Sequence, residues 1–175
     1  SDNFCGIIAC SNKNYQKIKE TAVRLGDFVS PDSCHLATKG LKTLKVRIDK
    51  HYDNARKVCN FLKKKKIISD IYFVADKQNK YHKLWKKYHT IGNGLLTFSL
   101  KKINDCRRFV DSLNLFKIGF SWGGYESLIL PLTNMKLTNN LSKTSKYWFR
   151  IHVGLESSDD LIKDLENALK SYETK

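Results

Sequence analysis

The stretch Phe116-Lys117-Ile118-Gly119-Phe120-Ser121-Trp122-Gly123-Gly124-Tyr125-Glu126-Ser127-Leu128 decides how the rest of this sequence is interpreted. In its first half Phe116, Ile118 and Phe120 alternate with other residues, and this period of two predicts a strand with one buried face. Two adjacent glycines then interrupt the pattern, and glycine lets the backbone turn sharply and approach a ligand closely. A hydroxyl, an indole and a phenol therefore follow the end of a strand. That arrangement fits a pocket wall, and it also fits an ordinary turn around a buried tryptophan.

The remaining hydrophobic pattern predicts both strands and helices. Strands are expected at residues 4–10, 71–74, 95–100, 116–120 and 147–153, and longer helices at 40–62, 102–113 and 158–171. Before them, one helix should begin after Ser11 and end at Gly26, and a short one should run from Pro31 through Ala37. These elements favour an α+β fold (α/β in the broad sense), with helices on one face of a mostly antiparallel sheet.

The composition is that of a globular protein. A chain of 175 residues with 41% hydrophobic and 28% charged residues can bury a sizeable core. Its apolar runs are too short to span a bilayer and its first residues do not resemble a signal peptide, so we expect a cytoplasmic protein without a membrane partner. Five cysteines without a Cys-x-x-Cys pair favour reduced thiols. Together with five dispersed histidines they predict no metal site.

The formal net charge of +15 raises the question of an anionic partner. The basic residues are 26 lysines and 6 arginines, whereas base readout and two-pronged phosphate contacts favour arginine. The lysines are also spread along the chain, with one true run at residues 63–66. This pattern does not favour nucleic acid as a partner, and a basic binding module is retained as an alternative from another functional class.

The strand expected at residues 147–153 contains an arginine between apolar neighbours. Alternation along this strand places Arg150 on the same face as Trp148 and His152. A guanidinium in such a setting needs an anionic partner, because burying it unpaired is costly. From the residues alone, the simplest partner is an aspartate or glutamate in a salt bridge. Elsewhere, a Ser121 nucleophile would lack a local base, and no glycine-rich phosphate loop of the P-loop type occurs.

Four motifs occur in a characteristic order along nearly the whole chain. They are Lys39-Gly40-Leu41-Lys42-Thr43-Leu44, then Trp85 with Gly94-Leu95 and Phe98, then Ser121-Trp122-Gly123-Gly124-Tyr125-Glu126-Ser127-Leu128, and finally Arg150-Ile151-His152-Val153-Gly154-Leu155-Glu156. In this order they resemble the C-terminal part of the cystathionine β-lyases, fold-type-I enzymes of cysteine and methionine metabolism that depend on pyridoxal 5'-phosphate (PLP). The resemblance implies that residues 1–30 are the tail of the large PLP-binding domain, 31–62 are connecting and long helices, and 63–175 are the C-terminal small domain.

The resemblance also implies a function. The family cleaves the C–S bond of L-cystathionine by β-elimination, which gives homocysteine, pyruvate and ammonia in methionine biosynthesis, and it assembles as homotetramers. It places Arg150 against the substrate α-carboxylate with Ser121 beside it, and it uses Phe120, Trp122 and Tyr125 to shape the pocket. The lysine that carries PLP would lie upstream of Ser1, so no catalytic residue is expected in this chain.

Two alternatives share the same scaffold. A γ-acting relative (a cystathionine γ-synthase or γ-lyase) resembles the chain as a whole, but typically lacks the aromatic pair found at Trp122 and Tyr125. A folded but non-catalytic remnant would account for a chain that does not contain the PLP lysine.

Overall fold

The computed structural model describes residues 3–132 and 146–174, and it divides the chain into two compact units, residues 1–45 and 46–175. The first unit contains α1 (Asn12–Leu25) and α2 (Pro31–Lys42). Gly26 ends α1 in the left-handed conformation, with φ 72°, as predicted. Ser30 caps α2 by accepting the N–H of Ser33. The helix continues to Lys42, five residues beyond its predicted end.

The predicted strand at residues 4–10 is wrong. This segment has no regular secondary structure, and Phe4 is fully exposed. A strand needs a neighbouring strand to satisfy its backbone N–H and C=O groups. The described part of the first unit contains helices only, so it offers no such neighbour. Ser1 and Asp2 lie outside the described residues.

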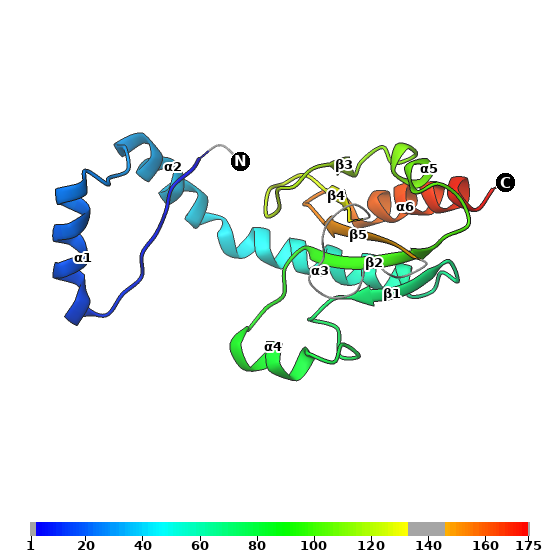
Figure 1. The fold of residues 1–175 in the computed structure, drawn as a ribbon, viewed down its shortest axis with the longest axis horizontal. Helices are drawn as coiled ribbons and strands as arrows, with labels where there is room; N and C mark the ends of the chain where they lie inside the picture. The colour runs from blue at the N-terminus through cyan, green and yellow to red at the C-terminus, as the bar shows by residue number, and fades with distance from the viewer. Residues whose placement is uncertain (1–2, 133–145, 175) are drawn as a thin grey trace. The chain divides into compact units, whose positions relative to one another are not determined.

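The second unit is built around a five-stranded sheet (Figure 1). In chain order, the elements after α2 are α3 (Leu44–Leu62), β1 (Ile68–Tyr72), α4 (His82–Tyr88), β2 (Leu95–Lys101), α5 (Cys106–Asp111), β3 (Lys117–Ile118), β4 (Leu128–Pro131), β5 (Lys146–His152) and α6 (Ser158–Glu173). The strand order is β1-β2-β5-β4-β3, and every neighbouring pair is antiparallel except β3 and β4. The predicted α+β architecture with a mostly antiparallel sheet is therefore confirmed.

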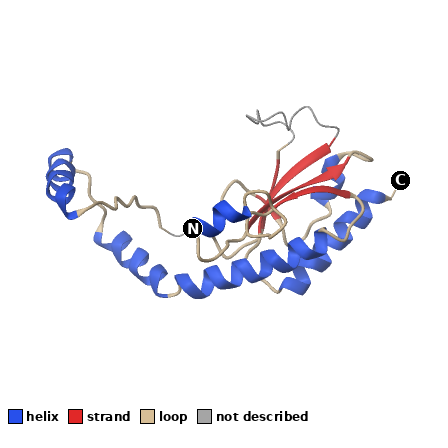
Figure 2. Ribbon diagram, turned by 90° about the horizontal axis from the view of Figure 1, so that it is seen from below, coloured by secondary structure: helices blue, strands red, loops and turns tan. Residues whose placement is uncertain are grey.

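One face of this sheet carries the hydrophobic core. The two long helices α3 and α6 lie along that face (Figure 2). Phe149 in the central strand β5 stacks on Phe98 with 5.5 Å between ring centroids, and it meets the edge of Phe109 at 5.2 Å. Fully burying one such ring contributes about 1.5–3 kcal/mol. The opposite face of β5 carries Arg150, which lies between Thr97 on β2 and Leu130 on β4.

Several boundaries differ from the sequence prediction. The helix expected at residues 40–62 is divided at Thr43, whose hydroxyl donates to the carbonyl of Gly40. The helix expected at 102–113 is shortened to α5, Cys106–Asp111. It begins only after Asp105, whose side chain accepts the N–H of Arg107 as the N-cap. Strand β4 and helix α4 were not predicted. The short apolar run of β4 and the lysine-rich sequence of α4 show little periodicity.

The strand expected at residues 116–120 is only partly present. Strand β3 covers Lys117–Ile118 at the edge of the sheet, and it pairs in parallel with β4. Phe116 is buried, but Ile118 and Phe120 are 66% and 73% exposed. The expectation that these three residues share one buried face is therefore wrong. An edge strand of two residues ends before the alternation can place Phe120 against the core.

The cysteines differ in exposure, and this gives a testable reactivity order. Cys5, Cys10 and Cys34 are exposed free thiols, whereas Cys59 on α3 is buried and burial raises its pKa to about 11. A pKa about 2 above the ordinary 9.0 lowers the thiolate fraction about a hundredfold. We expect Cys59 to react with a disulfide reagent at pH 8 at least about a hundredfold more slowly than the exposed thiols. Labelling followed by peptide mass spectrometry measures this, and equal rates would contradict the buried position of Cys59.

Candidate functional site

Arg150 is the charged group at the centre of the candidate site. Its Nη2 atom donates to the carbonyl oxygens of Gly119, Phe120 and Ser121 at 3.3, 2.7 and 3.2 Å. Within residues 3–132 and 146–174, neither Nε nor Nη1 has a hydrogen-bond partner, and Nε is buried. The same residues supply no carboxylate to Arg150, so the salt-bridge interpretation finds no partner among them.

The other predicted site residues lie in the loop that this guanidinium contacts, the candidate loop of residues 119–127 between β3 and β4. Phe120, Trp122 and Tyr125 are 73%, 62% and 73% exposed, and Ser121 is exposed beside them. The structure thus brings Arg150 to the backbone of Phe120 and Ser121, whereas the aromatic side chains project from the loop toward solvent. The turn around a buried tryptophan, considered as an alternative for this stretch, does not occur.

The two glycines of this loop lie against a buried histidine that the sequence analysis did not place in the site. His152 is 2% exposed, and its Nε2 atom lies 3.2 Å from the Gly123 nitrogen and 3.1 Å from the Gly124 oxygen. Burial lowers the pKa of His152, with a smaller contribution in the same direction from the His51 ring, although the contact with Gly124 and the nearby Glu126 and Glu156 oppose it. The signal for this residue was its position on the same strand face as Arg150.

The end of the loop is held by hydrogen bonds to the turn after β5. Glu156 accepts the backbone N–H and the hydroxyl of Ser127 at 2.8 and 2.9 Å, and the Ser127 hydroxyl in turn accepts the N–H of Gly154 at 2.8 Å. Asn54 on α3 donates to the carbonyl oxygens of Gly154 and Glu156 at 2.9 and 2.8 Å. Gly154 is required there, since an added Cβ would lie 2.3 Å from the Tyr125 oxygen.

The start of the loop is held by a second carboxylate. Asp164 on α6 is buried, and it accepts the backbone N–H groups of Asn114, Leu115 and Phe116 at 2.8, 2.9 and 3.3 Å. Three donors satisfy the charge of Asp164 and fix the chain immediately before β3. The candidate loop is therefore anchored on both sides by carboxylates from the segment that follows β5.

Buried polar atoms without a partner are concentrated around this loop. In the part of the chain that the structure describes there are four, namely His51 Nε2, Asn54 Oδ1, Glu126 Oε2 and Arg150 Nε. Buried polar groups are normally hydrogen-bonded, and exceptions call for an explanation such as a ligand or an ordered water. Their positions mark this end of the sheet as the candidate site.

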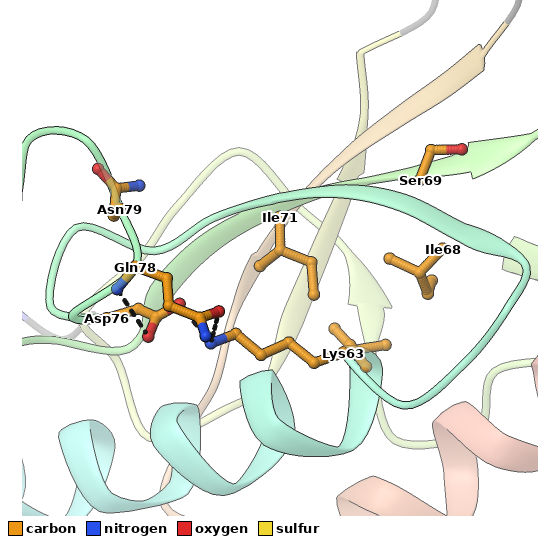
Figure 3. Close-up of a pocket in the computed structure, with 8 residues that line it drawn as sticks. Lys63, Ile68, Ser69, Ile71, Asp76, Gln78 and Asn79 are labelled. Atoms are coloured by element: carbon orange, nitrogen blue, oxygen red, sulfur yellow. Dashed lines mark hydrogen bonds and ion pairs between the residues drawn. The ribbon is translucent and has the colours of Figure 1, made fainter.

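A polar pocket elsewhere in the second unit does not offer comparable chemistry. A pocket of about 300 Å³ lies between the end of α3 and residues 68–79 (Figure 3). There Lys63 is already bound to Asp76 at 2.5 Å and to Gln78 at 3.2 Å, so its charge is neutralised. The described ranges contain no cluster of histidine, cysteine and acidic side chains arranged for a metal ion. They also contain no helix long and apolar enough to cross a membrane.

The fold is that of a known class of enzyme. Residues 1–170 match the model of the Cys/Met metabolism PLP-dependent enzymes, and the chain belongs to this family. It is 36% identical to a cystathionine β-lyase of Bordetella avium, with 97% of this chain and 44% of the relative covered. It is 32% identical to the cystathionine γ-lyase of Bos taurus, with 98% and 44% covered.

Solved structures of related enzymes have the same fold as this chain. A crystal structure of cystathionine γ-synthase from Xanthomonas oryzae in complex with cystathionine superposes with a TM-score of 0.83 at 28% identity. The superposition covers 95% of this chain and 45% of that one. The chain therefore has the fold of the C-terminal part of a fold-type-I PLP enzyme, and it spans less than half the length of the curated relatives that it matches.

The family depends on PLP, but the described residues do not offer a site for its covalent attachment. A lysine that carries PLP needs a desolvated position in which its amine can lose a proton. None of the lysines within the described ranges is buried. No reaction step is therefore assigned to the cofactor on the basis of these residues.

Proposed function

We propose that this chain is the substrate-binding C-terminal part of a cystathionine β-lyase, in which Arg150 binds the α-carboxylate of L-cystathionine. One observation carries the proposal. Two nitrogens of the Arg150 guanidinium have no partner among the described residues, although the third is fixed by the carbonyl oxygens of Gly119, Phe120 and Ser121. Such a group is pre-oriented and still has donors for an incoming carboxylate.

The residues of the loop have distinct tasks in this proposal. Arg150 holds the carboxylate and so orients the Cα–H bond, while the carbonyl contacts prevent the guanidinium from rotating away. Trp122, Tyr125 and Phe120 form the apolar wall of the pocket and exclude water from the substrate, with Ser121 at its edge. When bound, PLP supplies the electron sink for the reaction. The overall change consumes L-cystathionine and water and yields homocysteine, pyruvate and ammonia.

The γ-acting alternative has support of its own, because the curated relatives include several γ-lyases and the superposed structures include a γ-lyase and a γ-synthase. The β-lyase is preferred because Trp122 and Tyr125 both project from the loop at the candidate site. We further propose that the complete protein forms a homotetramer in the cytoplasm. The domain boundaries at residues 30 and 62 stay a prediction, as does the alternative of a non-catalytic remnant.

Two chimeras test which bond the complete enzyme breaks. In each, this chain replaces the matching C-terminal part of a relative, in one case the Bordetella β-lyase and in the other the bovine γ-lyase. β-Elimination of L-cystathionine releases pyruvate, whereas γ-elimination releases 2-oxobutyrate. We expect the first chimera to release pyruvate, and the second to release more pyruvate relative to 2-oxobutyrate than the bovine parent does.

The bovine parent and a Trp122→Ala, Tyr125→Ala version of the second chimera are the matched controls. The double variant should return the product ratio toward that of the parent if these rings favour β-elimination. If 2-oxobutyrate dominates in both chimeras, the γ-acting alternative replaces the β-lyase. Loss of all activity in both, with a folded protein and bound PLP, would favour the non-catalytic remnant.

A further inference from the structure

We propose that His152 is a positioning residue for the glycine turn at Gly123 and Gly124, holding the turn when its imidazole is neutral and releasing it when the ring is protonated. The significance of the turn for substrate binding rests on the proposed function, because Ser121 and Trp122 lead into it. The contact between His152 and the turn is independent of that function, and it can be measured in this chain alone.

The geometry fixes the ring from two sides. Gly123 has φ 86°, and its N–H points at the ring, 3.2 Å from Nε2 and 3.5 Å from Nδ1, while the Gly124 oxygen lies 3.1 Å from Nε2. Behind the ring, Gly94 leaves the space that the imidazole occupies. A Cβ at Gly94 would lie 2.9 Å from both Cε1 and Nδ1 of His152.

Only the neutral ring can serve both backbone groups. Neutral imidazole has one N–H donor and one bare nitrogen acceptor, whereas imidazolium has two donors and no acceptor. Because the Gly124 oxygen can only accept, Nε2 must carry the proton and donate to it at 3.1 Å, and the bare Nδ1, 3.5 Å from the Gly123 nitrogen, is the acceptor left for the Gly123 N–H. Protonation keeps the bond to Gly124 but places an N–H against the N–H of Gly123. Gly123 is exposed and its contact with the ring is only part-buried, so its N–H can turn to water instead of facing an imidazolium N–H, and this side of the turn should open.

The surroundings of His152 determine the direction of the pH dependence. The charged or titratable groups that face it are His51 on α3, Glu126 in the loop and Glu156 after β5. The His51 ring lies 4.9 Å away, donates through Nδ1 to the Val153 oxygen at 2.8 Å, and leaves Nε2 buried without a described partner. Burial and His51 lower the pKa of His152, and Gly124 and the two glutamates oppose this only in part.

The sign of the effect follows from this lowered pKa. The unfolded chain takes up the proton near the ordinary value of about 6.5, before the folded chain does. The contribution of neutral His152 to stability is therefore complete above about pH 6.5, and it decreases as the pH falls from that value through the folded pKa. The turn should be ordered at neutral pH and released in acid.

Nuclear magnetic resonance on the 175-residue chain tests the proposal without any activity measurement. The readouts are the Gly123 amide, the Trp122 indole and the Cε1–H signals of His152 and His51 between pH 8 and 5. We expect the Gly123 order parameter to fall from about 0.85 to below about 0.6, with the midpoint of the His152 signal rather than that of His51. The Trp85 indole should show no transition at this midpoint.

Three variants separate positioning from general stability. His152→Gln supplies a donor and an acceptor that do not titrate, so the turn should stay ordered at every pH. His152→Leu removes both, so the turn should be mobile at pH 8 while the signals of Phe98 and Phe149 stay native. His89→Gln alters an exposed histidine that stacks on Trp85, and it should behave as the parent does.

The proposal would be overturned if the Gly123 signals stayed unchanged through the His152 transition. It would also be overturned if the acid transition of the turn persisted in His152→Gln. Should His152→Leu not fold, the parent titration and His152→Gln still decide. If the turn opens at the His152 transition as expected but both chimeras prove inactive, this inference is supported and the proposed function is rejected.

Discussion

On its own, the chain is expected to release no pyruvate from L-cystathionine above a control that contains free PLP, whereas the chimera with the Bordetella β-lyase turns over. The difference follows from the cofactor. None of the described lysines lies in the buried setting that a covalent PLP site needs, and we expect the retained part of the Bordetella enzyme to supply that site in the chimera. Because enzymes accelerate reactions by 10⁶-fold or more, the contrast should be on the order of 10⁶-fold in rate.

Reduction with borohydride followed by peptide mapping completes this test. With 26 lysines, the lone chain should trap PLP at scattered surface positions and in variable amounts. A control at matched free PLP concentration with an unrelated lysine-rich protein should give the same pattern. If a single lysine of this chain instead trapped one PLP per chain and pyruvate accumulated, substrate binding could no longer be its only role.

Replacement of Asp164 by leucine is expected to lower the free energy of unfolding by about 3–5 kcal/mol. The carboxylate accepts three backbone N–H groups, those of Asn114, Leu115 and Phe116, and the variant leaves these donors without an acceptor. A hydrogen bond to a charged group contributes about 1.5–3 kcal/mol, and the three are not independent. Urea unfolding followed by circular dichroism gives the difference.

Asp160→Asn is the matched control for this prediction. Asp160 lies one turn earlier on α6 and is exposed, so its effect should be limited to the interaction with the helix N-terminus, about 0.3–1 kcal/mol. If Asp164→Leu unfolded at the same urea concentration as Asp160→Asn, Asp164 would not anchor the chain before β3. Circular dichroism of the folded baseline should show whether α6 itself is intact in both variants.

The central part of the fold could be predicted from the sequence because it follows regular periods. Strands β2 and β5 carry apolar residues at alternate positions that lie in the core, namely Leu96, Phe98 and Leu100 on β2 and Phe149 and Ile151 on β5. Helix α6 begins after Ser157, whose hydroxyl accepts the Asp160 N–H, and its first residue, Ser158, is the predicted start. Capping residues and periodicity act locally, so a single sequence contains the information that they require.

The edge of the sheet could not be predicted in the same way. Strand β3 is set by its parallel pairing with β4 and by the Asp164 carboxylate, both of which come from residues later in the chain. Alternation at residues 116–120 suggested burial that tertiary contacts do not provide. The prediction of a strand at residues 4–10 failed for a related reason, since a short apolar run does not reveal whether a partner strand exists.

The candidate site, too, could be predicted from the sequence only in part. Periodicity placed Arg150 on the same strand face as Trp148 and His152, and the family resemblance marked it as a carboxylate ligand. Neither predicted that the guanidinium would bind the carbonyl oxygens of Phe120 and Ser121, because backbone contacts between distant segments leave no pattern in side-chain chemistry. The roles of Glu156 and Asn54 in holding the loop were missed for the same reason.

The most direct test of the account is Arg150→Lys in the chimera with the Bordetella β-lyase, with KM and melting temperature measured on the same protein. Lysine keeps the charge but loses the planar, two-pronged geometry. Loss of one charge-assisted bond of about 1.5–3 kcal/mol predicts a KM for L-cystathionine about 10- to 150-fold higher, with a smaller fall in kcat because the same grip aligns the Cα–H bond. The melting temperature should stay near that of Arg108→Lys, an exposed control on α5. An unchanged KM with a lowered melting temperature would show that Arg150 only braces the loop, and it would remove this residue from the substrate site.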